Sequence, residues 1–316
     1  MGSLLILLSA ASTALASLHI ADYDKSFIGD PDVFIIGVQK GGTTSLSSFL
    51  MYRLKNFVES YRRKELHFFD KYFNDESFND YIKGFVEEKD HRGTHSYHYL
   101  SLDSSPAYFR TPIVWQRIVK LYSPESLRQK KFILSLRDPI SRDFSWFSHY
   151  YGECKKYDTP FCPSKGGPHF HDTFHDYVER NFRKGTHPGD GFYVQNLKSF
   201  LEFIPRSQLF IINFESLIDE SRQQDTLHRM LHFLGIPPVN ADDVSFPHAN
   251  SKEKHCEGGC DDENLHEIRC SDLMFLNETY SRANHGLVDF INSDPDRPES
   301  EPLFQPFEER IQLECK

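Results

Sequence analysis

Residues 33–46 read Val-Phe-Ile-Ile-Gly-Val-Gln-Lys-Gly-Gly-Thr-Thr-Ser-Leu and contain more structural information than any other segment of the chain. The apolar run 33–38 predicts a strand that is buried on both faces, as in a parallel sheet. A Lys-Gly-Gly-Thr-Thr turn follows it. From Ser45 to Leu54 the apolar residues recur at helical spacing, so a helix is expected directly after the turn.

This strand, turn and helix together predict a binding site for a phosphate-type anion. Backbone amides of the turn and the positive end of the helix converge on one point there. The candidate contacts are Lys40, Gly41, Gly42, Thr43 and Thr44. The stretch is not a Walker A loop, because Lys40 precedes the glycine pair instead of following it. Taken alone, it is also compatible with an ordinary glycine turn of an α/β protein.

A second segment, residues 131–147, predicts a partner for that anion site. Its apolar run 132–136 reads as another buried strand, which Asp138-Pro139 ends because proline cannot continue a ladder. Arg137 therefore lies at the carboxyl end of a strand, where open α/β sheets bind ligands, and Ser145 follows on the next helix. A guanidinium and a hydroxyl placed in this way can hold a phosphate dianion. Arg142 is the weaker candidate and is expected to face solvent.

The third segment, residues 63–70, reads Arg-Lys-Glu-Leu-His-Phe-Phe-Asp and predicts acid–base chemistry. A group transfer to a hydroxyl needs a base for the acceptor proton and cations for the developing negative charge. Glu65 is the candidate base, with Lys64 and His67 beside it. The alternative is that Glu65 is a solvated loop acid and that His67 and its two phenylalanines only pack.

Together the three segments resemble the carbohydrate sulfotransferases that use 3′-phosphoadenosine 5′-phosphosulfate (PAPS). Their sequences are most similar to those of the Golgi heparan sulfate 3-O- and N-sulfotransferases. The resemblance implies that residues 40–44 hold the 5′-phosphosulfate, and that Arg137 and Ser145 hold the 3′-phosphate. It further implies catalytic roles for Glu65 as general base, for Lys40 and for His67. Arg63 and Lys64 would contact the acceptor.

The resemblance extends over residues 31–292. Residues 103–109, Asp-Ser-Ser-Pro-Ala-Tyr-Phe, are similar to the family's EKTPAYF segment and imply acceptor contacts for Ser104 and Tyr108. Ser104 stands where the family has a lysine, which puts the acceptor class or the transfer rate in question. Residues 250–256 are similar to the stretch that closes over the nucleotide and imply that Lys252 contacts the cofactor. The K-G-R signature that follows the second cysteine in the family is missing.

The order of the apolar runs predicts the fold class. Strands are expected at 33–38, 132–136 and 209–213 with helices between them, which favours an α/β fold with a P-loop-like, doubly wound parallel sheet flanked by helices, the sulfotransferase fold. Residues 1–17 are expected to be a signal peptide or a short signal-anchor. Residues 18–292 form the sulfotransferase domain in this interpretation. Residues 293–316 are expected to be a polar and poorly ordered C-terminal extension.

The leader and the six cysteines predict an oxidising secretory compartment, either the Golgi lumen or the exterior of the cell. Cys154 and Cys162 can close a local loop, and Cys256 can pair with Cys260 or Cys270. Sequence alone does not decide this connectivity, and zinc binding at the later cysteines is the less favoured alternative. Asn277 begins a glycosylation sequon.

The net charge of −10 argues against a simple polyanion-binding protein, and no nucleic-acid motif is visible. Basic residues nevertheless cluster near Glu65, so a local basic cleft is compatible with the sequence. A smaller, less charged acceptor is equally compatible with it. The sixteen histidines include His171 and His175 at chelating spacing, yet the implied mechanism requires no metal.

The sequence therefore predicts an enzyme that transfers a sulfuryl group from PAPS to a carbohydrate hydroxyl, in preference to an amine, and releases adenosine 3′,5′-bisphosphate. The expected acceptor is a glycosaminoglycan-type polysaccharide or oligosaccharide. Membrane contact is expected only through an N-terminal anchor. Two alternatives stay open: a non-catalytic PAPS-fold binding protein and a nucleotide-dependent kinase.

Overall fold

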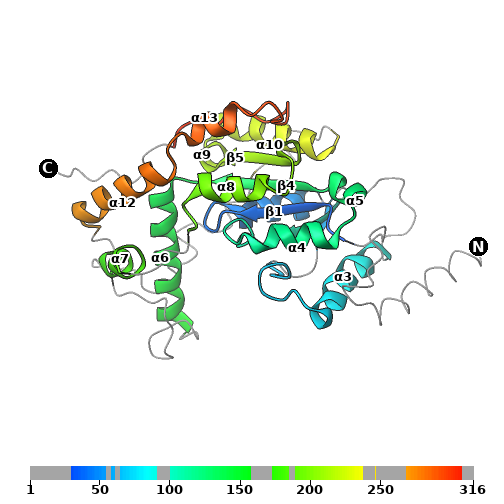
Figure 1. Ribbon diagram of the computed structural model, residues 1–316, viewed down its shortest axis with the longest axis horizontal. Coiled ribbons are helices and arrows are strands. Elements are labelled where there is room, and N and C mark those ends of the chain that lie inside the picture. The colour runs from blue at the N-terminus through cyan, green and yellow to red at the C-terminus, as the bar shows by residue number, and fades with distance from the viewer. Residues whose placement is uncertain are drawn as a thin grey trace, which may run out of the picture.

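A parallel sheet of five strands, in the order β2-β3-β1-β4-β5, forms the centre of the computed structural model (Figure 1). The strands are β1 (Val33–Gly37), β2 (Val58–Ser60), β3 (Leu100–Ser104), β4 (Lys131–Leu136) and β5 (Leu209–Asn213). The structure describes residues 30–54, 58–60, 65–90, 100–157, 173–184, 189–237, 246 and 268–307. The three predicted strands are confirmed as β1, β4 and β5.

Helices cover both faces of the sheet, so the predicted doubly wound architecture is confirmed. Side chains alternate along β1: Phe34 and Ile36 pack on one face, and Val33 and Ile35 pack on the other. The first face carries α3 (Asp75–Asp90), α4 (Ile113–Leu121), α8 (Tyr193–Leu201) and α13 (Leu287–Asn292). The second face carries α2 (Thr43–Ser48), η3 (Phe49–Arg53), α9 (Phe214–Ile218) and α10 (Glu220–Leu234). The short α5 (Pro124–Gln129) and η6 (Arg206–Gln208) precede β4 and β5.

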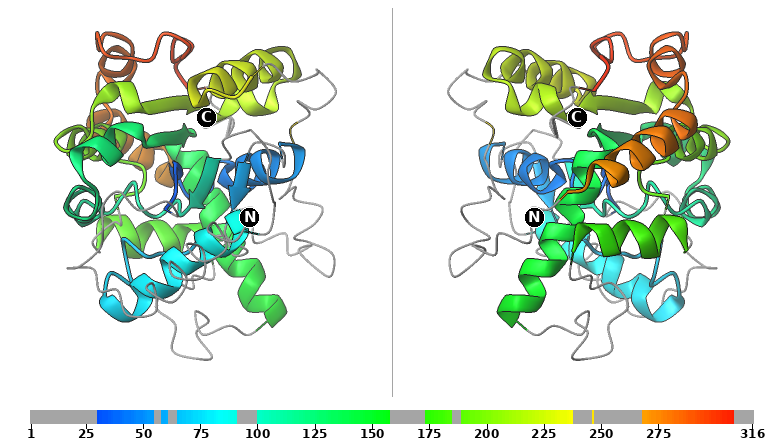
Figure 2. Two further views of the ribbon diagram at one scale, coloured as in Figure 1. Left: turned by 90° about the vertical axis from the view of Figure 1, so that its right-hand side faces the viewer. Right: turned by 90° about the vertical axis from the view of Figure 1, so that its left-hand side faces the viewer.

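A third group of helices stands beside the sheet. It consists of α6 (Pro139–Tyr157), α7 (Phe174–Val178), η5 (Glu179–Arg183) and α12 (Cys270–Ala283). An aromatic cluster that includes Phe147, Phe174 and Tyr280 joins them. Figures 1 and 2 show α6 running away from the sheet with α7 alongside it. None of the helices in the described ranges combines the length and the apolar character that a bilayer span needs.

Arg142, on α6, is fully buried, so the expectation that it faces solvent is wrong. Its guanidinium pairs with Asp143 and, at 3.0 Å, with Asp190. Tyr177 on α7 and Tyr280 on α12 donate hydroxyl hydrogen bonds to Asp143. The buried charge is thus paired on both sides, and the network connects α6, α7 and α12.

The prediction of a poorly ordered extension is wrong for residues 293–307, which pack against the edge strand β5. Glu301 is only 2% exposed and pairs with Arg206. The Glu301 carboxylate also accepts the amide hydrogen of Ile211 at 2.7 Å. Phe304 joins the core of the first face of the sheet. The polar composition of this segment is misleading because Glu301 is paired and buried instead of solvated.

Candidate functional site

The turn after β1 is pressed against β4. The Val38 amide donates to the carbonyl oxygen of Ser135 at 2.9 Å, and the Gly41 amide donates to the Val38 carbonyl oxygen at the same distance. A Cβ atom on Gly41 would lie 2.6 Å from the Ser135 oxygen, so no larger residue fits there. Gly42 adopts φ +81° and starts α2. The glycine pair is therefore a packing and backbone requirement of this turn.

Arg137 directly follows β4 and lies against the turn after β1. Its Nη1 donates to the carbonyl oxygen of Lys40 at 3.1 Å, and its guanidinium carbon lies 4.8 Å from the centre of the Phe214 ring. The same ring would collide with a Cβ atom on Gly42. Tyr193 donates its hydroxyl hydrogen to the Arg137 carbonyl oxygen at 2.6 Å. The first two predicted segments thus meet, and Phe214 is a member of the site that the sequence interpretation missed.

The predicted hydroxyl donors occupy the first turns of two helices. Thr43 is buried at the start of α2, and Thr44 beside it is half-buried. Gly42 provides no side-chain cap for this helix, as an anion-binding helix start requires. Ser145 is half-buried on α6, the helix that follows Arg137. Its contact with a phosphate stays a prediction.

Glu65 and His67 lie on a loop that is joined to the carboxyl end of β3. The Glu65 amide donates to the carbonyl oxygen of Ser104 at 3.0 Å. The side chain of Glu65 is 38% exposed, and its Oε2 lies 3.7 Å from Nε2 of His67. Nδ1 of His67 lies 2.9 Å from Oδ2 of Asp70. The imidazole therefore stands between two carboxylates, one of which is open to solvent.

The two carboxylates keep His67 charged. Burial by itself would lower the pKa of His67, but the hydrogen bonds with Asp70 and Glu65 outweigh it and raise this pKa to about 9. At neutral pH the imidazolium offsets part of the negative charge of the loop, and its Nε2 lies close to the Glu65 carboxylate. Asp70 belongs to the predicted acid–base segment but had no predicted role, and the structure identifies it as the partner of His67.

We expect the imidazole of His67 to titrate near pH 9 in the folded protein. A histidine with a raised pKa stabilises the fold fully below its unfolded value of about 6.5, and this contribution is lost as the pH rises through 9. A pH series of imidazole NMR spectra, with the signal assigned by its absence in His67→Gln, measures the pKa. Titration of this signal near pH 6.5 would contradict the assignment.

Phe68 and Phe69 next to His67 are core residues, as the packing alternative expects. Both are at most 1% exposed and stack within an aromatic cluster on the first face of the sheet. The Phe69 carbonyl oxygen accepts a hydrogen bond of 2.6 Å from Arg117 on α4. The motif therefore combines an exposed acid with two buried anchors.

Ser104 and Tyr108 lie inside the domain. Ser104 is 3% exposed at the end of β3, and Tyr108 is fully buried. The Tyr108 hydroxyl donates to Asp103 at 3.0 Å. Two of the side chains that the resemblance assigned to the acceptor, Ser104 and Tyr108, therefore do not lie on the surface.

Several predicted residues fall outside the part of the chain that the structure describes. These are Arg63, Lys64, Cys162, His171, Lys252, Cys256, Cys260 and the side chain of Cys154. Cys270 is disulfide-bonded at the start of α12, and Asn277 is exposed on the same helix. Of the two histidines at chelating spacing, His175 pairs with Asp272 at 2.9 Å. Within the described ranges, no group of three or more potential ligands is arranged to hold a metal ion.

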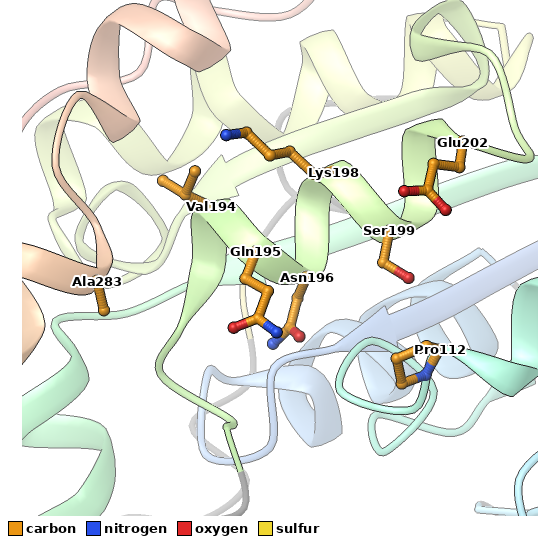
Figure 3. A pocket seen from close by; sticks show the side chains of 8 residues that line it. All are labelled: Pro112, Val194, Gln195, Asn196, Lys198, Ser199, Glu202 and Ala283. Carbon is orange, nitrogen blue, oxygen red and sulfur yellow. The ribbon is translucent and has the colours of Figure 1, made fainter.

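A separate hollow of about 480 Å³ lies along the outer side of α8 (Figure 3). Gln195, Lys198 and Ser199 line it, together with Pro112 before α4 and Ala283 at the end of α12. None of the predicted site residues contributes to this hollow. Tyr193, which contacts Arg137, belongs to the buried side of the same helix.

The chain is similar in sequence to known proteins of one family. Residues 30–259 match the sulfotransferase domain family. Heparan sulfate glucosamine 3-O-sulfotransferase 5 of Mus musculus is 30% identical over 210 residues, which cover 66% of this chain and 54% of that protein. Heparan sulfate glucosamine 3-O-sulfotransferase 6 of Mus musculus is 27% identical over 220 residues, which cover 67% and 54% respectively. The chain thus spans about half the length of the curated relatives that it matches.

A solved structure shares the fold. The sulfotransferase from Alicyclobacillus acidocaldarius aligns with a TM-score of 0.56 over 84% of this chain and 98% of that one. Its sequence identity of 19% makes this a likeness of fold alone. The predicted fold class is confirmed.

Proposed function

The chain belongs to the sulfotransferase domain family, and on this premise we propose that it transfers a sulfuryl group from PAPS to a hydroxyl of a glycosaminoglycan-type carbohydrate. The observation that supports this most strongly is the meeting of three distant segments at one edge of the sheet. β1 lies between β3 and β4. The turn after β1, Arg137 after β4, and the Glu65 loop joined to the end of β3 therefore share the carboxyl edge, where doubly wound sheets bind ligands.

The residues at this edge fit the donor PAPS. Its two phosphate-bearing ends require cations and amides, and the structure offers Arg137 beside the turn and a helix start whose N-cap glycine provides no side-chain cap. Lys40, Gly41, Gly42, Thr43 and Thr44 would hold the phosphosulfate end. Arg137 and Ser145 would hold the 3′-phosphate, with Lys252 as a further contact. When bound, PAPS supplies the sulfuryl group.

The chain itself provides the proton transfer and the charge stabilisation. Glu65 accepts the proton of the acceptor hydroxyl, a role for which its partly exposed carboxylate is open. His67, held charged between Glu65 and Asp70, orients that carboxylate. Lys40 stabilises the negative charge that develops on the oxygen between phosphate and sulfate.

The proposed acceptor class rests on the relatives. The curated relatives carry the name heparan sulfate glucosamine 3-O-sulfotransferase, which favours a hydroxyl over an amine. The net charge of −10 argues against a simple polyanion-binding protein, but the basic residues that cluster in the sequence near Glu65 are compatible with a local basic cleft for a polyanionic acceptor. Ser104, in the place of the family's lysine, makes the acceptor of this chain a question to measure directly.

We further propose that the protein works in the lumen of the secretory pathway, in the Golgi or after secretion. The disulfide at Cys270 supports this, since structural disulfides form and persist in oxidising compartments. The proposed glycosylation at the exposed Asn277 belongs to the same compartment.

A ligand-binding experiment tests the donor. We expect adenosine 3′,5′-bisphosphate to raise the melting temperature, by the equivalent of about 2.7 kcal/mol at a hundredfold excess over its Kd, and ATP to have little effect. Arg137→Ala should lose most of this stabilisation. Arg128→Ala, which removes an exposed arginine on α5, should keep it. Stabilisation by ATP alone would favour the kinase alternative.

A transfer experiment tests the reaction. Radiolabelled sulfate from PAPS is offered to desulfated heparan, chondroitin, dermatan and neutral glycans, and label on one of them identifies the acceptor class. Binding of the bisphosphate without transfer to any glycan would favour the non-catalytic alternative.

A further inference from the structure

Asp103, on β3, is a buried carboxylate that the proposed chemistry does not use. It is fully buried and accepts three hydroxyl hydrogen bonds. Tyr81 and Tyr108 each donate to Oδ2 at 3.0 Å, and Ser105 donates to Oδ1 at 2.7 Å. Burial raises the pKa of Asp103 to about 6, although the hydrogen bonds from Ser105, Tyr108 and Tyr81 act to lower it. Above that pH the carboxylate is ionised and can accept from all three donors.

Two of these hydroxyls also receive the backbone of the Glu65 loop. The His67 amide donates to Oγ of Ser105 at 3.3 Å, and the Phe69 amide donates to the Tyr108 hydroxyl at 3.3 Å. A hydroxyl that donates its own hydrogen to a carboxylate becomes a better and a directed acceptor. Asp103 thus fixes the direction of Ser105 and Tyr108, and these two hold alternate amides of the loop.

The loop needs such a clamp because its backbone is strained. Glu65 adopts φ +61° and His67 adopts φ +53°, in the left-handed region that residues other than glycine rarely occupy. Strained conformations of this kind persist only where the surroundings hold them in place. The loop has contacts on both sides of each strained residue: the Glu65 amide donates to the Ser104 carbonyl oxygen, the His67 amide to Ser105 and the Phe69 amide to Tyr108.

We propose that Asp103, Ser105 and Tyr108 form a positioning relay that fixes the Glu65 and His67 side chains in their productive directions. The proposal rests on the proposed function, in which Glu65 is the base. None of the three relay residues contacts a reacting atom in this scheme, since all three are fully buried and the Tyr108 hydroxyl meets Asp103 and the loop amide. A small displacement of a catalytic group lowers the reaction rate strongly, so residues that hold Glu65 in place affect the rate without contacting the substrate.

The chain contains a matched pair of variants for testing the relay. Tyr81→Phe and Tyr108→Phe each remove one buried hydroxyl that donates to the same oxygen of Asp103 at 3.0 Å. Only the Tyr108 hydroxyl also accepts a loop amide. Both variants keep their aromatic rings, so the ring contacts with Phe68 and Phe69 remain. Ser105→Ala removes the other loop acceptor.

We expect Tyr108→Phe and Ser105→Ala to lower kcat by at least about 10-fold, with KM for PAPS changed by less than about twofold. Tyr81→Phe should lower the melting temperature by a similar amount but reduce kcat far less. Hydrogen exchange of the peptide spanning 65–70 should accelerate in the first two variants and stay near wild type in Tyr81→Phe. Equal losses of kcat in the two tyrosine variants, or unchanged exchange of the loop in Tyr108→Phe, would overturn the relay.

The exchange measurement separates this proposal from the proposed function. It needs no acceptor, so it decides the role of the relay even where no glycan is sulfated. Conversely, transfer that is lost in Glu65→Gln but retained in Tyr108→Phe would keep the sulfotransferase and reject the relay.

Discussion

Replacing Glu65 with glutamine is expected to lower sulfuryl transfer by about 10²- to 10⁴-fold, the range typical of a general base. Glutamine has nearly the same shape, but it cannot accept the proton of the acceptor hydroxyl at neutral pH. The fold should tolerate the change, because the side chain is 38% exposed and the backbone amide keeps its hydrogen bond to Ser104. Binding of adenosine 3′,5′-bisphosphate should be unchanged.

The measurement is the initial rate of label transfer from PAPS at saturating donor. Glu125→Gln is the matched control, since it makes the same substitution at an exposed glutamate on α5. Because α5 precedes β4, Glu125 lies at the opposite end of that strand from Arg137. Glu65→Asp retains the charge on a shorter side chain and should recover part of the rate. If Glu65→Gln transfers sulfate as fast as Glu125→Gln, Glu65 is not the base and another group must take the proton.

The central part of the fold could be predicted because its residues are locally consistent. The runs 33–38, 132–136 and 209–213 are almost entirely apolar, as strands covered on both faces must be, and a glycine pair or a proline follows the first two within a few residues. The same reasoning placed Arg137 at a carboxyl end, where it indeed contacts the carbonyl oxygen of Lys40. Helix stops were equally visible, since Gly235 adopts φ +76° after α10.

Features that depend on polar residues in the interior could not be predicted in this way. β3 reads Leu-Ser-Leu-Asp-Ser and has no apolar run, yet it is a buried strand, and Asp103 is buried because tyrosine and serine hydroxyls satisfy its carboxylate. For the same reason Arg142 was expected to face solvent, and the segment that contains Glu301 was expected to be poorly ordered. A buried charge needs a partner that is distant in sequence, and here Arg206 and Glu301 are 95 positions apart.

The candidate site was predictable at the level of motifs and unpredictable at the level of contacts. The sequence identified Glu65 and His67 together, but the pairing of His67 with Asp70 and the Ser104 anchor of Glu65 depend on a loop with left-handed residues. Phe214 could not be predicted as a site residue, because its position depends on the pairing of β5 with β4. This pairing brings the Phe214 ring against both Arg137 and Gly42.

Removing the charge of Lys40 is the second change with a large expected effect. We expect Lys40→Met to lower kcat and kcat/KM together by about 10²- to 10³-fold, the cost of losing one donor to a charge that develops in the transition state. Methionine keeps an unbranched stem and takes the same φ of +69°, so the strain of the turn is equal in both proteins. Lys40→Arg should restore only part of the rate, because a planar guanidinium does not replace a compact ammonium.

The form of the loss in Lys40→Met distinguishes two roles for this residue. A lysine that only binds the donor would raise KM for PAPS and leave kcat at saturation unchanged. A lysine that stabilises the leaving oxygen loses kcat even at saturation, while Arg137 still retains the bisphosphate. Lys198→Met, on the exposed side of α8, controls for the general loss of a positive charge. A rise in KM alone would reduce Lys40 to a binding residue and assign the charge stabilisation to another cation at the carboxyl edge of the sheet.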